Sequence, residues 1–287
     1  MMARIISGKE LSLSIKEKMK EEILYYKRVY ERLPHLVVVL VGDDPASKSY
    51  VKGKEQASLE IGIENTTICL PDDITEESLL AKIDELNNDD TVDGILVQLP
   101  LPLHINKEHV IERIRLDKDV DGFHPLNVAA LWQKREGMIP CTPRGIISLL
   151  NSANIPLAGK NAVIMGRSDI VGLPISKLLL DQNATVTIVH SRTENVKEIT
   201  RKADILIVAI GKPKYVTADF IKDGAVVIDV GVNRDPQTHK LCGDCDFSSC
   251  EPKASFITKV PGGVGPMTIC CLMQNTLEAY LHHMEEK

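Results

Sequence analysis

Tyr50 and Lys54 are the residues of this chain whose types and spacing first suggest chemistry. They stand four positions apart in a stretch expected to be helical, so their side chains share one face of the helix. A lysine that can be neutral acts as a general acid or base, and a tyrosine beside it can assist. The spacing alone favours a structural interpretation, in which the lysine stem covers a packed tyrosine.

Gln98 and the aspartates of residues 117–125 are further candidates. Gln98 stands at the expected carboxyl end of a strand, where its amide can accept a hydrogen bond from a lysine and hold it, although such a glutamine is usually a turn residue. Asp117, Asp119 and Asp121 alternate as in a calcium loop, but the glutamate expected at the twelfth position is missing. The sequence therefore does not favour calcium.

Residues 161–174 (N-A-V-I-M-G-R-S-D-I-V-G-L-P) predict a strand, a tight turn and a helix. Such a turn after a parallel strand can hold a pyrophosphate, because free N–H groups and the helix dipole point at it. Gly166 and Gly172 do not have the G-x-G-x-x-G spacing, so only the physical context of a dinucleotide site remains. An ordinary turn is the alternative.

The next strand, 184–190, ends in a sequence that indicates which dinucleotide binds. An Asp or Glu at this point would bind the 2′-hydroxyl of NAD, but the chain has Ser191, Arg192 and Thr193 there, with Arg167 in the first turn. Two guanidinium groups and two hydroxyls suit a 2′-phosphate. We therefore predict NADP, with two solvated surface arginines as the alternative.

The composition restricts the class of protein. With 287 residues, a net charge of −6 and no long basic block, the chain is not expected to bind nucleic acid or an anionic membrane. We expect a cytoplasmic protein, because neither a signal-like apolar run nor an 18-residue apolar segment is present.

Seven cysteines without an export signal suggest reduced thiols. Cys242, Cys245 and Cys250 contain a C-x2-C element, but His239 is the only nearby candidate for a fourth ligand. No metal is expected.

The order of apolar runs and helical patterns predicts an α/β protein in two domains, the second with a Rossmann-like parallel sheet. We expect a catalytic domain over 1–140, completed by a helix over 268–287, and a dinucleotide domain over 141–267. Ser47 or Ser49 is expected to cap the helix of Tyr50. The expected strands are 36–41, 68–70, 92–99, 161–165, 184–190, 203–211, 225–231 and 256–260, and the expected helices are 10–33, 75–86, 145–150, 173–180 and 268–283.

Five motifs carry a resemblance that covers nearly the whole chain: Tyr50-x3-Lys54, 98–102 (Q-L-P-L-P), 119–123 (D-V-D-G-F), 166–174 (G-R-S-D-I-V-G-L-P) and 261–268 (P-G-G-V-G-P-M-T). In this order they closely resemble the bifunctional methylenetetrahydrofolate dehydrogenase/methenyltetrahydrofolate cyclohydrolase family, called FolD in bacteria. The resemblance implies two α/β domains with a cleft between them, a homodimer formed through the dinucleotide domains, an NADP cofactor and a folate substrate.

The resemblance also implies roles for single residues. Lys54 would be the catalytic lysine, Tyr50 and Gln98 its positioning partners, and Asp121 the anchor for the pterin ring. The folate pocket would include Leu99, Pro261, Gly262, Gly263 and Gly265. The NADP side would include Gly166, Arg167, Ser168, Ile170, Val171, Gly172, Pro174, Ser191, Arg192, Gly211 and Val232.

The chain departs from the family pattern at two points. Relatives commonly have K-x-K where this chain has Lys54-Glu55-Gln56, which affects only a helper lysine. Relatives tend to have G-D-V-D-F where residues 243–247 read G-D-C-D-F, so Cys245 stands in place of a valine. The C-x2-C element is therefore interpreted as accidental.

Two alternatives belong to other classes. An enzyme similar to shikimate dehydrogenase also pairs a small α/β substrate domain with an NADP domain, but would use a lysine–aspartate pair on a hydroxy acid. A non-catalytic NADP-sensing module would keep Arg167 and Arg192 but would not need the lysine, tyrosine, glutamine and aspartate named above. The presence of all four favours an enzyme.

Overall fold

The computed structural model describes residues 2–285, which divide into two compact units. The three-stranded unit comprises residues 14–141 and 269–285, and the six-stranded unit comprises residues 2–13 and 142–268. Two long helices, α1 (Gly8–Tyr30) and α10 (Val264–Glu285), contribute residues to both units.

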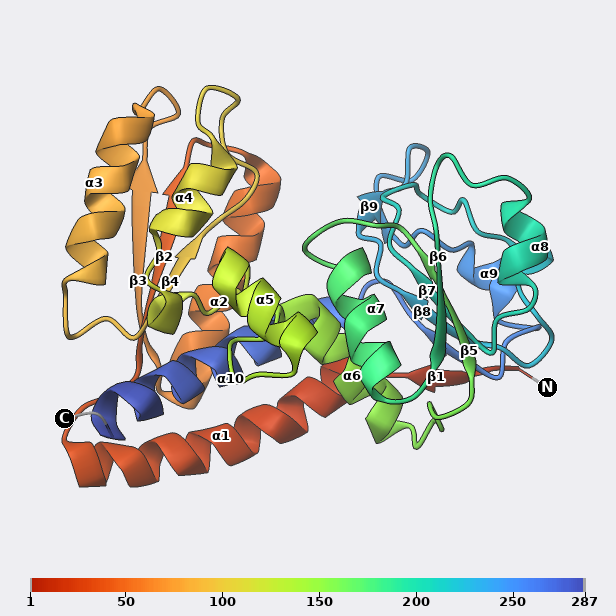
Figure 1. Cartoon of the computed structure of the whole chain (residues 1–287), viewed down its shortest axis with the longest axis horizontal. Coiled ribbons are helices and arrows are strands. Elements are labelled where there is room, and N and C mark those ends of the chain that lie inside the picture. The colour runs from red at the N-terminus through yellow and green to blue at the C-terminus, as the bar shows by residue number, and fades with distance from the viewer. Residues whose placement is uncertain (1, 286–287) are drawn as a thin grey trace. The chain divides into compact units, whose positions relative to one another are not determined.

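The three-stranded unit is built on the parallel sheet β3-β2-β4. The central strand β2 (His35–Val41) is almost entirely buried, as expected of an apolar strand with parallel neighbours on both sides. Its neighbours are β3 (Glu64–Leu70) and β4 (Gly94–Val97). The α-helices, labelled in Figure 1, are α2 (Pro45–Ile61), α3 (Glu76–Asn87), α4 (Lys107–Arg113) and α5 (Pro125–Gln133), and a short 3-10 helix covers Leu116–Lys118.

The six-stranded unit contains one parallel sheet in the order β1-β11-β8-β7-β5-β6. The strands are β1 (Arg4–Ile6), β5 (Asn161–Met165), β6 (Thr185–Val189), β7 (Ile205–Val208), β8 (Val226–Asp229) and β11 (Phe256–Thr258). A two-stranded antiparallel ribbon, β9 (Asn233–Arg234) with β10 (Leu241–Cys242), lies outside this sheet. The helical segments are α6 (Cys141–Ser152), α7 (Gly172–Asp181), α8 (Val196–Thr200), a 3-10 helix (Ala218–Phe220) and α9 (Phe247–Cys250).

The N-terminal segment corrects one sequence expectation. Residues 1–140 were assigned to a single domain, but β1 belongs to the sheet of the six-stranded unit, where Ile5 is in register with Ile257 of β11. A three-residue strand has too few positions to show an apolar pattern, and its partner lies about 250 residues away in the sequence. Local sequence therefore carries no signal for this pairing.

Two helix starts also differ from expectation. The helix α2 is capped by Asp44, whose carboxylate accepts a hydrogen bond from the Ser47 N–H at 2.7 Å, so neither Ser47 nor Ser49 is the cap. The helix α10 begins at Val264, four residues before the expected Thr268. Pro266 is accommodated because it lies in the first turn, where no intrahelical N–H bond is required.

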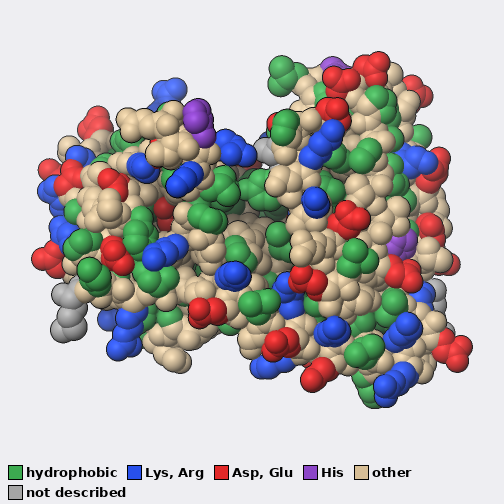
Figure 2. Space-filling view, turned by 180° about the vertical axis from the view of Figure 1, so that it is seen from behind, with side chains coloured by type: hydrophobic (Ala, Val, Ile, Leu, Met, Phe, Trp, Pro, Cys, Tyr) green, Lys and Arg blue, Asp and Glu red, His purple; other side chains and the backbone are tan. Residues whose placement is uncertain are grey.

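The described residues include no helix with the length and apolar character needed to cross a bilayer. The face shown in Figure 2 has Lys and Arg side chains interspersed with Asp and Glu. On this face neither sign of charge forms one large continuous patch.

Candidate active site

Lys54 and Gln98 meet in the three-stranded unit. Lys54 projects from α2, Gln98 follows the last residue of β4, and the Lys54 ammonium donates a hydrogen bond to the Gln98 Oε1 at 2.9 Å. The Gln98 Nε2 in turn donates to the Leu99 carbonyl at 2.6 Å, which fixes the orientation of the amide. The Leu99–Pro100 peptide bond is cis. The glutamine therefore presents an acceptor, and not a donor, to the lysine.

The environment of Lys54 lowers the pKa of its amine. Burial lowers the pKa of Lys54 below its ordinary value of 10.5, while the negative charge of Asp121 acts in the opposite direction. Burial also raises the pKa of Asp121 to about 6, although the positive charge of Lys54 acts to lower it. A lysine and a carboxyl group whose pKa values move toward neutrality are suited to proton transfer near pH 7.

Tyr50 lies one helical turn before Lys54 on α2. Its side chain is 43% exposed, and burial of the remainder raises the pKa of the phenol. Among the described residues no hydrogen bond joins Tyr50 to Lys54. The lysine–glutamine pair therefore forms without the phenol, and the positioning role of Tyr50 stays a prediction.

The three aspartates of the 117–125 loop have different surroundings, which separates their roles. Asp119 is buried and accepts hydrogen bonds from the His124 N–H and the Asn127 side chain, both at 2.8 Å, so it organises the loop. Asp117 pairs with Arg115 and His283. Asp121 is the one whose charge acts on Lys54. The three carboxylates thus do not converge on a shared ion.

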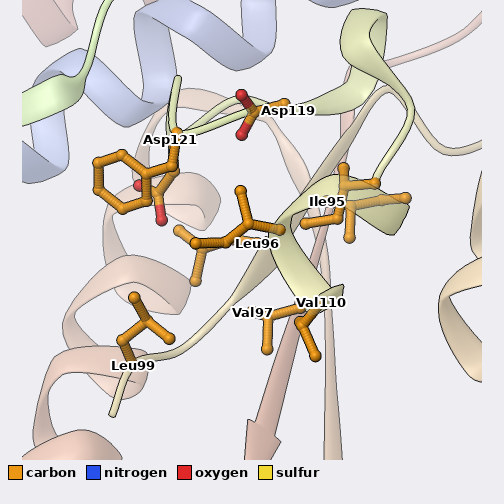
Figure 3. A pocket seen from close by; sticks show the side chains of 10 residues that line it. Ile95, Leu96, Val97, Leu99, Val110, Asp119 and Asp121 are labelled. Atoms are coloured by element: carbon orange, nitrogen blue, oxygen red, sulfur yellow. The ribbon is translucent and has the colours of Figure 1, made fainter. Parts of the chain in front are cut away.

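A small cavity lies beside Asp121. Its volume is about 10 Å³, which is close to the minimum for one water molecule. Figure 3 shows the carboxyl groups of Asp119 and Asp121 on one loop, set apart from each other, with the apolar side chains of Leu96 and Val97 below them. This apolar lining is the local cause of the desolvation of Asp121.

The helix α10 holds the loop of Asp121 in place. The Asn275 amide donates to the Val120 carbonyl at 2.8 Å and to the Ile139 carbonyl at 2.9 Å. The Cys141 thiol donates to the same Val120 carbonyl at 3.4 Å. Asn275 is completely buried. The residue just before Asp121 is therefore fixed by a side chain more than 150 positions away in the sequence.

The carboxyl ends of four neighbouring strands form a second candidate site, in the six-stranded unit. Gly166 follows β5, Ser191 follows β6, Gly211 follows β7 and Val232 follows β8. In the sheet, β6 lies on one side of β5, and the next strand of the chain, β7, lies on the other side. The direction in which successive strands are added to the sheet therefore reverses between β5 and β7. Ligands of open parallel sheets bind at such a reversal.

Two glycines of the first turn are required by close packing. A Cβ at Gly166, which has a φ of +120°, would lie 2.1 Å from the Ala209 carbonyl oxygen. A Cβ at Gly172 would lie 2.5 Å from the Gly166 carbonyl oxygen, and its N–H donates to the Ser168 hydroxyl at 3.3 Å. Both glycines, which are separated by five residues, are therefore required by the packing of this turn, although their spacing differs from the G-x-G-x-x-G motif.

The other expected cofactor residues lie around this turn. Arg167, Ser168 and Ile170 are exposed in the turn, and Val171 and Pro174 flank the start of α7. Ser191 and Arg192 are exposed after β6, and Gly211 and Val232 are exposed after β7 and β8. The N-cap residue of α7, Val171, has no polar side-chain atom and provides no side-chain cap.

Of the expected folate-side glycines, Gly262 and Gly263 lie between β11 and α10. Pro261 follows a cis peptide bond and is exposed, and Gly262 has a φ of +105°. Gly263 is buried, and a Cβ there would lie 2.6 Å from the Lys259 carbonyl oxygen. Gly265 belongs to the first turn of α10, in a stretch that was expected to be a loop.

The cysteine cluster contributes to packing. Cys245 and Cys250 belong to the apolar core of the six-stranded unit, and none of the seven cysteines, all within the described residues, forms a disulfide bond. The described residues contain no group of three or more His, Cys, Asp or Glu side chains arranged to hold a metal ion.

Sequence reasoning missed three buried polar residues: Asn275, Asp229 and Asp244. Asp229 ends the apolar run 225–229 (A-V-V-I-D), and Asp244 stands in the G-D-C-D-F segment. A carboxylate at the end of a buried strand was the available signal. The partners of all three residues, however, follow only from the fold.

An open parallel sheet with a glycine turn at its point of reversal, together with a second α/β unit that holds a desolvated lysine, defines a two-domain nucleotide-dependent dehydrogenase. The comparisons identify the particular kind. Residues 6–121 match the family model for the tetrahydrofolate dehydrogenase/cyclohydrolase catalytic domain, and residues 140–284 match the model for its NAD(P)-binding domain. The chain belongs to the tetrahydrofolate dehydrogenase/cyclohydrolase family.

Individual relatives agree along the full length of the chain. The bifunctional protein FolD of Bacillus anthracis is 54% identical over 279 residues, or 97% of each chain. The structure of the Campylobacter jejuni bifunctional enzyme FolD superposes with a TM-score of 0.95 at 47% identity and covers 98% of this chain and 99% of that one. A Trypanosoma brucei FolD, complexed with NADP cofactor and inhibitor, gives a TM-score of 0.95 at 37% identity and 98% coverage of both.

Proposed function

We propose that this chain oxidises 5,10-methylenetetrahydrofolate to the 5,10-methenyl form with NADP⁺, and then hydrolyses that product to 10-formyltetrahydrofolate, as a bifunctional enzyme of one-carbon metabolism. The observation that carries the proposal is the desolvated Lys54, hydrogen-bonded to Gln98 within the electric field of Asp121. The pair lies in the unit that matches the catalytic-domain model of the family.

The dehydrogenase step needs little proton chemistry from the protein. A hydride leaves the methylene carbon, and the lone pairs of the two flanking nitrogens stabilise the cation that remains. The nicotinamide supplies the hydride acceptor. The protein therefore has to orient the folate and exclude water. Asp121 is the proposed anchor for the pterin, and Tyr50, Leu99, Pro261, Gly262, Gly263 and Gly265 complete the proposed folate-binding set.

The cyclohydrolase step does need proton transfer. Water adds to the methenyl carbon, one proton leaves this adduct, and one proton reaches N5 as the C–N5 bond breaks. Lys54 is proposed to carry both protons, since burial lowers its pKa and makes the neutral amine accessible. The Gln98 oxygen accepts only, so it holds the ammonium in place and leaves the other protons for transfer.

The cofactor is NADP, and the charges around the strand ends support this choice. The residues fit the group, since Gly166 and Gly172 allow the tight turn after β5 and the side chains of Arg167, Ser191 and Arg192 are exposed beside it. Arg167, Ser191 and Arg192 are proposed to hold the 2′-phosphate, while Ser168, Ile170, Val171, Pro174, Gly211 and Val232 are proposed to line the rest of the dinucleotide.

A homodimer and a cytoplasmic location complete the proposal. The edge strand β6 ends the six-stranded sheet, and its middle residues are half-buried. An edge of this kind is suited to pairing with a second copy. Light scattering of the purified protein tests the dimer, because a mass near 63 kDa is expected for two chains of 31.7 kDa.

The decisive experiment follows NADPH and the methenyl chromophore together, after 5,10-methylenetetrahydrofolate is mixed with NADP⁺ or NAD⁺. NADPH that rises with little methenyl build-up indicates two coupled activities. Accumulated methenyl product indicates a weak second step. Absence of NADPH formation refutes the proposal and favours the alternative of a non-catalytic NADP-sensing module. The shikimate-like alternative is not favoured, because both halves of the chain match tetrahydrofolate family models.

Lys54→Met tests the proton carrier. Methionine keeps the length and apolar stem of the side chain but cannot transfer a proton. We expect hydrolysis of methenyltetrahydrofolate to fall by about 10²-fold or more, with a smaller loss of hydride transfer. The matched control is Lys52→Met on the exposed side of the same helix, which should leave both activities unchanged. Equal, modest losses of both activities in Lys54→Met would exclude the proton-carrier role.

A further inference from the structure

The carboxylate of Asp244 joins two loops of the six-stranded unit. Its Oδ2 accepts hydrogen bonds from the backbone N–H groups of Ile210, at 2.7 Å, and Gly211, at 3.0 Å. Its Oδ1 accepts from the Lys212 N–H and from the Asn233 side chain, both at 2.8 Å. The first three donors belong to the loop that follows β7. The fourth lies on β9, directly after residues 230–232, which form the loop that follows β8 (the β8 loop).

This arrangement is closely packed. Asp244 is completely buried, and its own N–H donates to Asp229 at 2.9 Å. A Cβ on Gly231 would lie 2.3 Å from the Asp244 carboxyl carbon, so the β8 loop contacts the carboxylate directly. A buried carboxylate with four donors is stabilised only while those donors stay in place. The positions of the two loops and of Asp244 therefore depend on one another.

The same two loops carry residues proposed to line the cofactor. Gly211, whose N–H is bound by Asp244, is exposed and has a φ of +64°. Val232 is exposed between Gly231 and Asn233. The Asp244 side chain itself has no access to solvent and cannot contact a ligand. Any effect of Asp244 on binding must pass through the loops.

We propose that Asp244 is a positioning residue for the dinucleotide, which acts by fixing the loops of Gly211 and Val232 at the edge of the sheet. The inference rests on the proposed placement of the cofactor at those loops. It assigns a purpose to the G-D-C-D-F segment, which neither the hydride transfer nor the hydrolysis uses. Asp246 of the same segment has a different task, since it caps α9 by accepting from the Ser249 N–H at 3.2 Å.

Asp244→Asn is the sharpest test, because it preserves shape and changes one acceptor atom into a donor. The asparagine oxygen can serve one side of the original carboxylate, while its NH₂ group faces N–H donors on the other side. We expect the dissociation constant of NADPH, measured by fluorescence titration, to rise about tenfold or more. The KM for NADP⁺ should rise with it, while the KM for the folate stays within about twofold.

Asp246→Asn is the matched control, because it removes one carboxylate from the same segment and weakens a helix cap without touching either loop. It should leave NADPH binding within about twofold of the wild type. Hydrolysis of methenyltetrahydrofolate needs no hydride acceptor, so this activity should persist in both variants. Its persistence shows that the three-stranded unit remains folded.

The outcomes separate this inference from the proposed function. A wild-type enzyme without folate turnover refutes the proposed function, while NADPH titration still tests Asp244. Unchanged NADPH binding by Asp244→Asn overturns the inference. If Asp244→Asn fails to fold, Asn233→Ala decides, because it removes one of the four donors and should weaken NADPH binding about two- to fivefold. Unchanged binding by Asn233→Ala would then overturn the inference.

Discussion

His283→Leu offers a quantitative test of how α10 is fastened to the three-stranded unit. The His283 ring lies between two carboxylates, with Nδ1 3.0 Å from Asp93 and Nε2 3.0 Å from Asp117. Arg32 and Arg115 hold those carboxylates from their other sides. Because both ring nitrogens face acceptors, the ring is bound as the doubly protonated cation.

The magnitude follows from the titration of the ring. Hydrogen bonds to Asp117 and Asp93 raise the pKa of His283 to about 9 from an ordinary value of 6.5. A rise of that size corresponds to about 3.4 kcal/mol, and we reduce it to about 2 kcal/mol because solvent screens the partly exposed Asp117. Since the folded-state pKa is the higher one, this stabilisation is complete below pH 6.5 and is lost as the pH rises to about 9.

The assay compares urea denaturation of wild type and His283→Leu at a series of pH values, followed by far-UV circular dichroism. The stability difference should be about 2 kcal/mol at pH 6 and should shrink toward a small constant above pH 9.5. His282→Leu is the control: His282 is 54% exposed and lies 3.6 Å from Glu136, so its loss should cost at most about 0.5 kcal/mol. A His283→Leu difference that stays constant from pH 6 to pH 9.5 would refute the reasoning.

Two further predictions concern ligand binding. Arg192→Ala should raise the KM for NADP⁺ about 10- to 100-fold and leave the KM values for NAD⁺ and folate nearly unchanged, because the lost interaction is with the 2′-phosphate; equal effects on both dinucleotides in steady-state assays would contradict the assignment. Asn275→Leu leaves the Val120 carbonyl without its amide donor, so the KM for the folate should rise about tenfold while NADPH binding is retained. The control is Thr276→Val, since the Thr276 hydroxyl is equally buried but donates within α10, to the Leu272 carbonyl; a folate KM that does not separate the two variants would exclude a positioning role for Asn275.

The sequence predicted those parts of the fold that depend on local pattern. The apolar runs of β2 and β5 and the strand–turn–helix around Gly166 show their conformation within a few residues, because a strand buried on both faces needs continuous apolar side chains. The residue types left a hydrogen bond from a lysine to Gln98 as one possibility beside a simple turn glutamine, the family resemblance favoured Lys54 as that lysine, and the structure contains the bond. The catalytic roles of the two residues remain predictions.

The remaining features depend on contacts that local sequence does not encode. Asp244 was noticed only as part of a family motif, since its donors at 210–212 lie more than 30 positions earlier. Asn275 looks like any polar residue of an amphipathic helix until the fold places it against Val120. In both cases a polar side chain is buried because backbone groups from distant segments need a partner.

The division of each unit between distant parts of the chain has a consequence for folding during synthesis. The six-stranded sheet cannot include β1 until β11 has been made, because the two strands pair across about 250 residues. The three-stranded unit lacks its contacts from Asn275 and His283 until residues 269–285 have left the ribosome. Domains generally fold as units while the chain is being synthesised. Neither unit of this protein can complete its fold until its late segments have been made, so apolar surface stays exposed to solvent until then. We therefore expect the interval between the synthesis of β2 and that of α10 to be the period in which the apolar surface of the nascent chain is most open to aggregation.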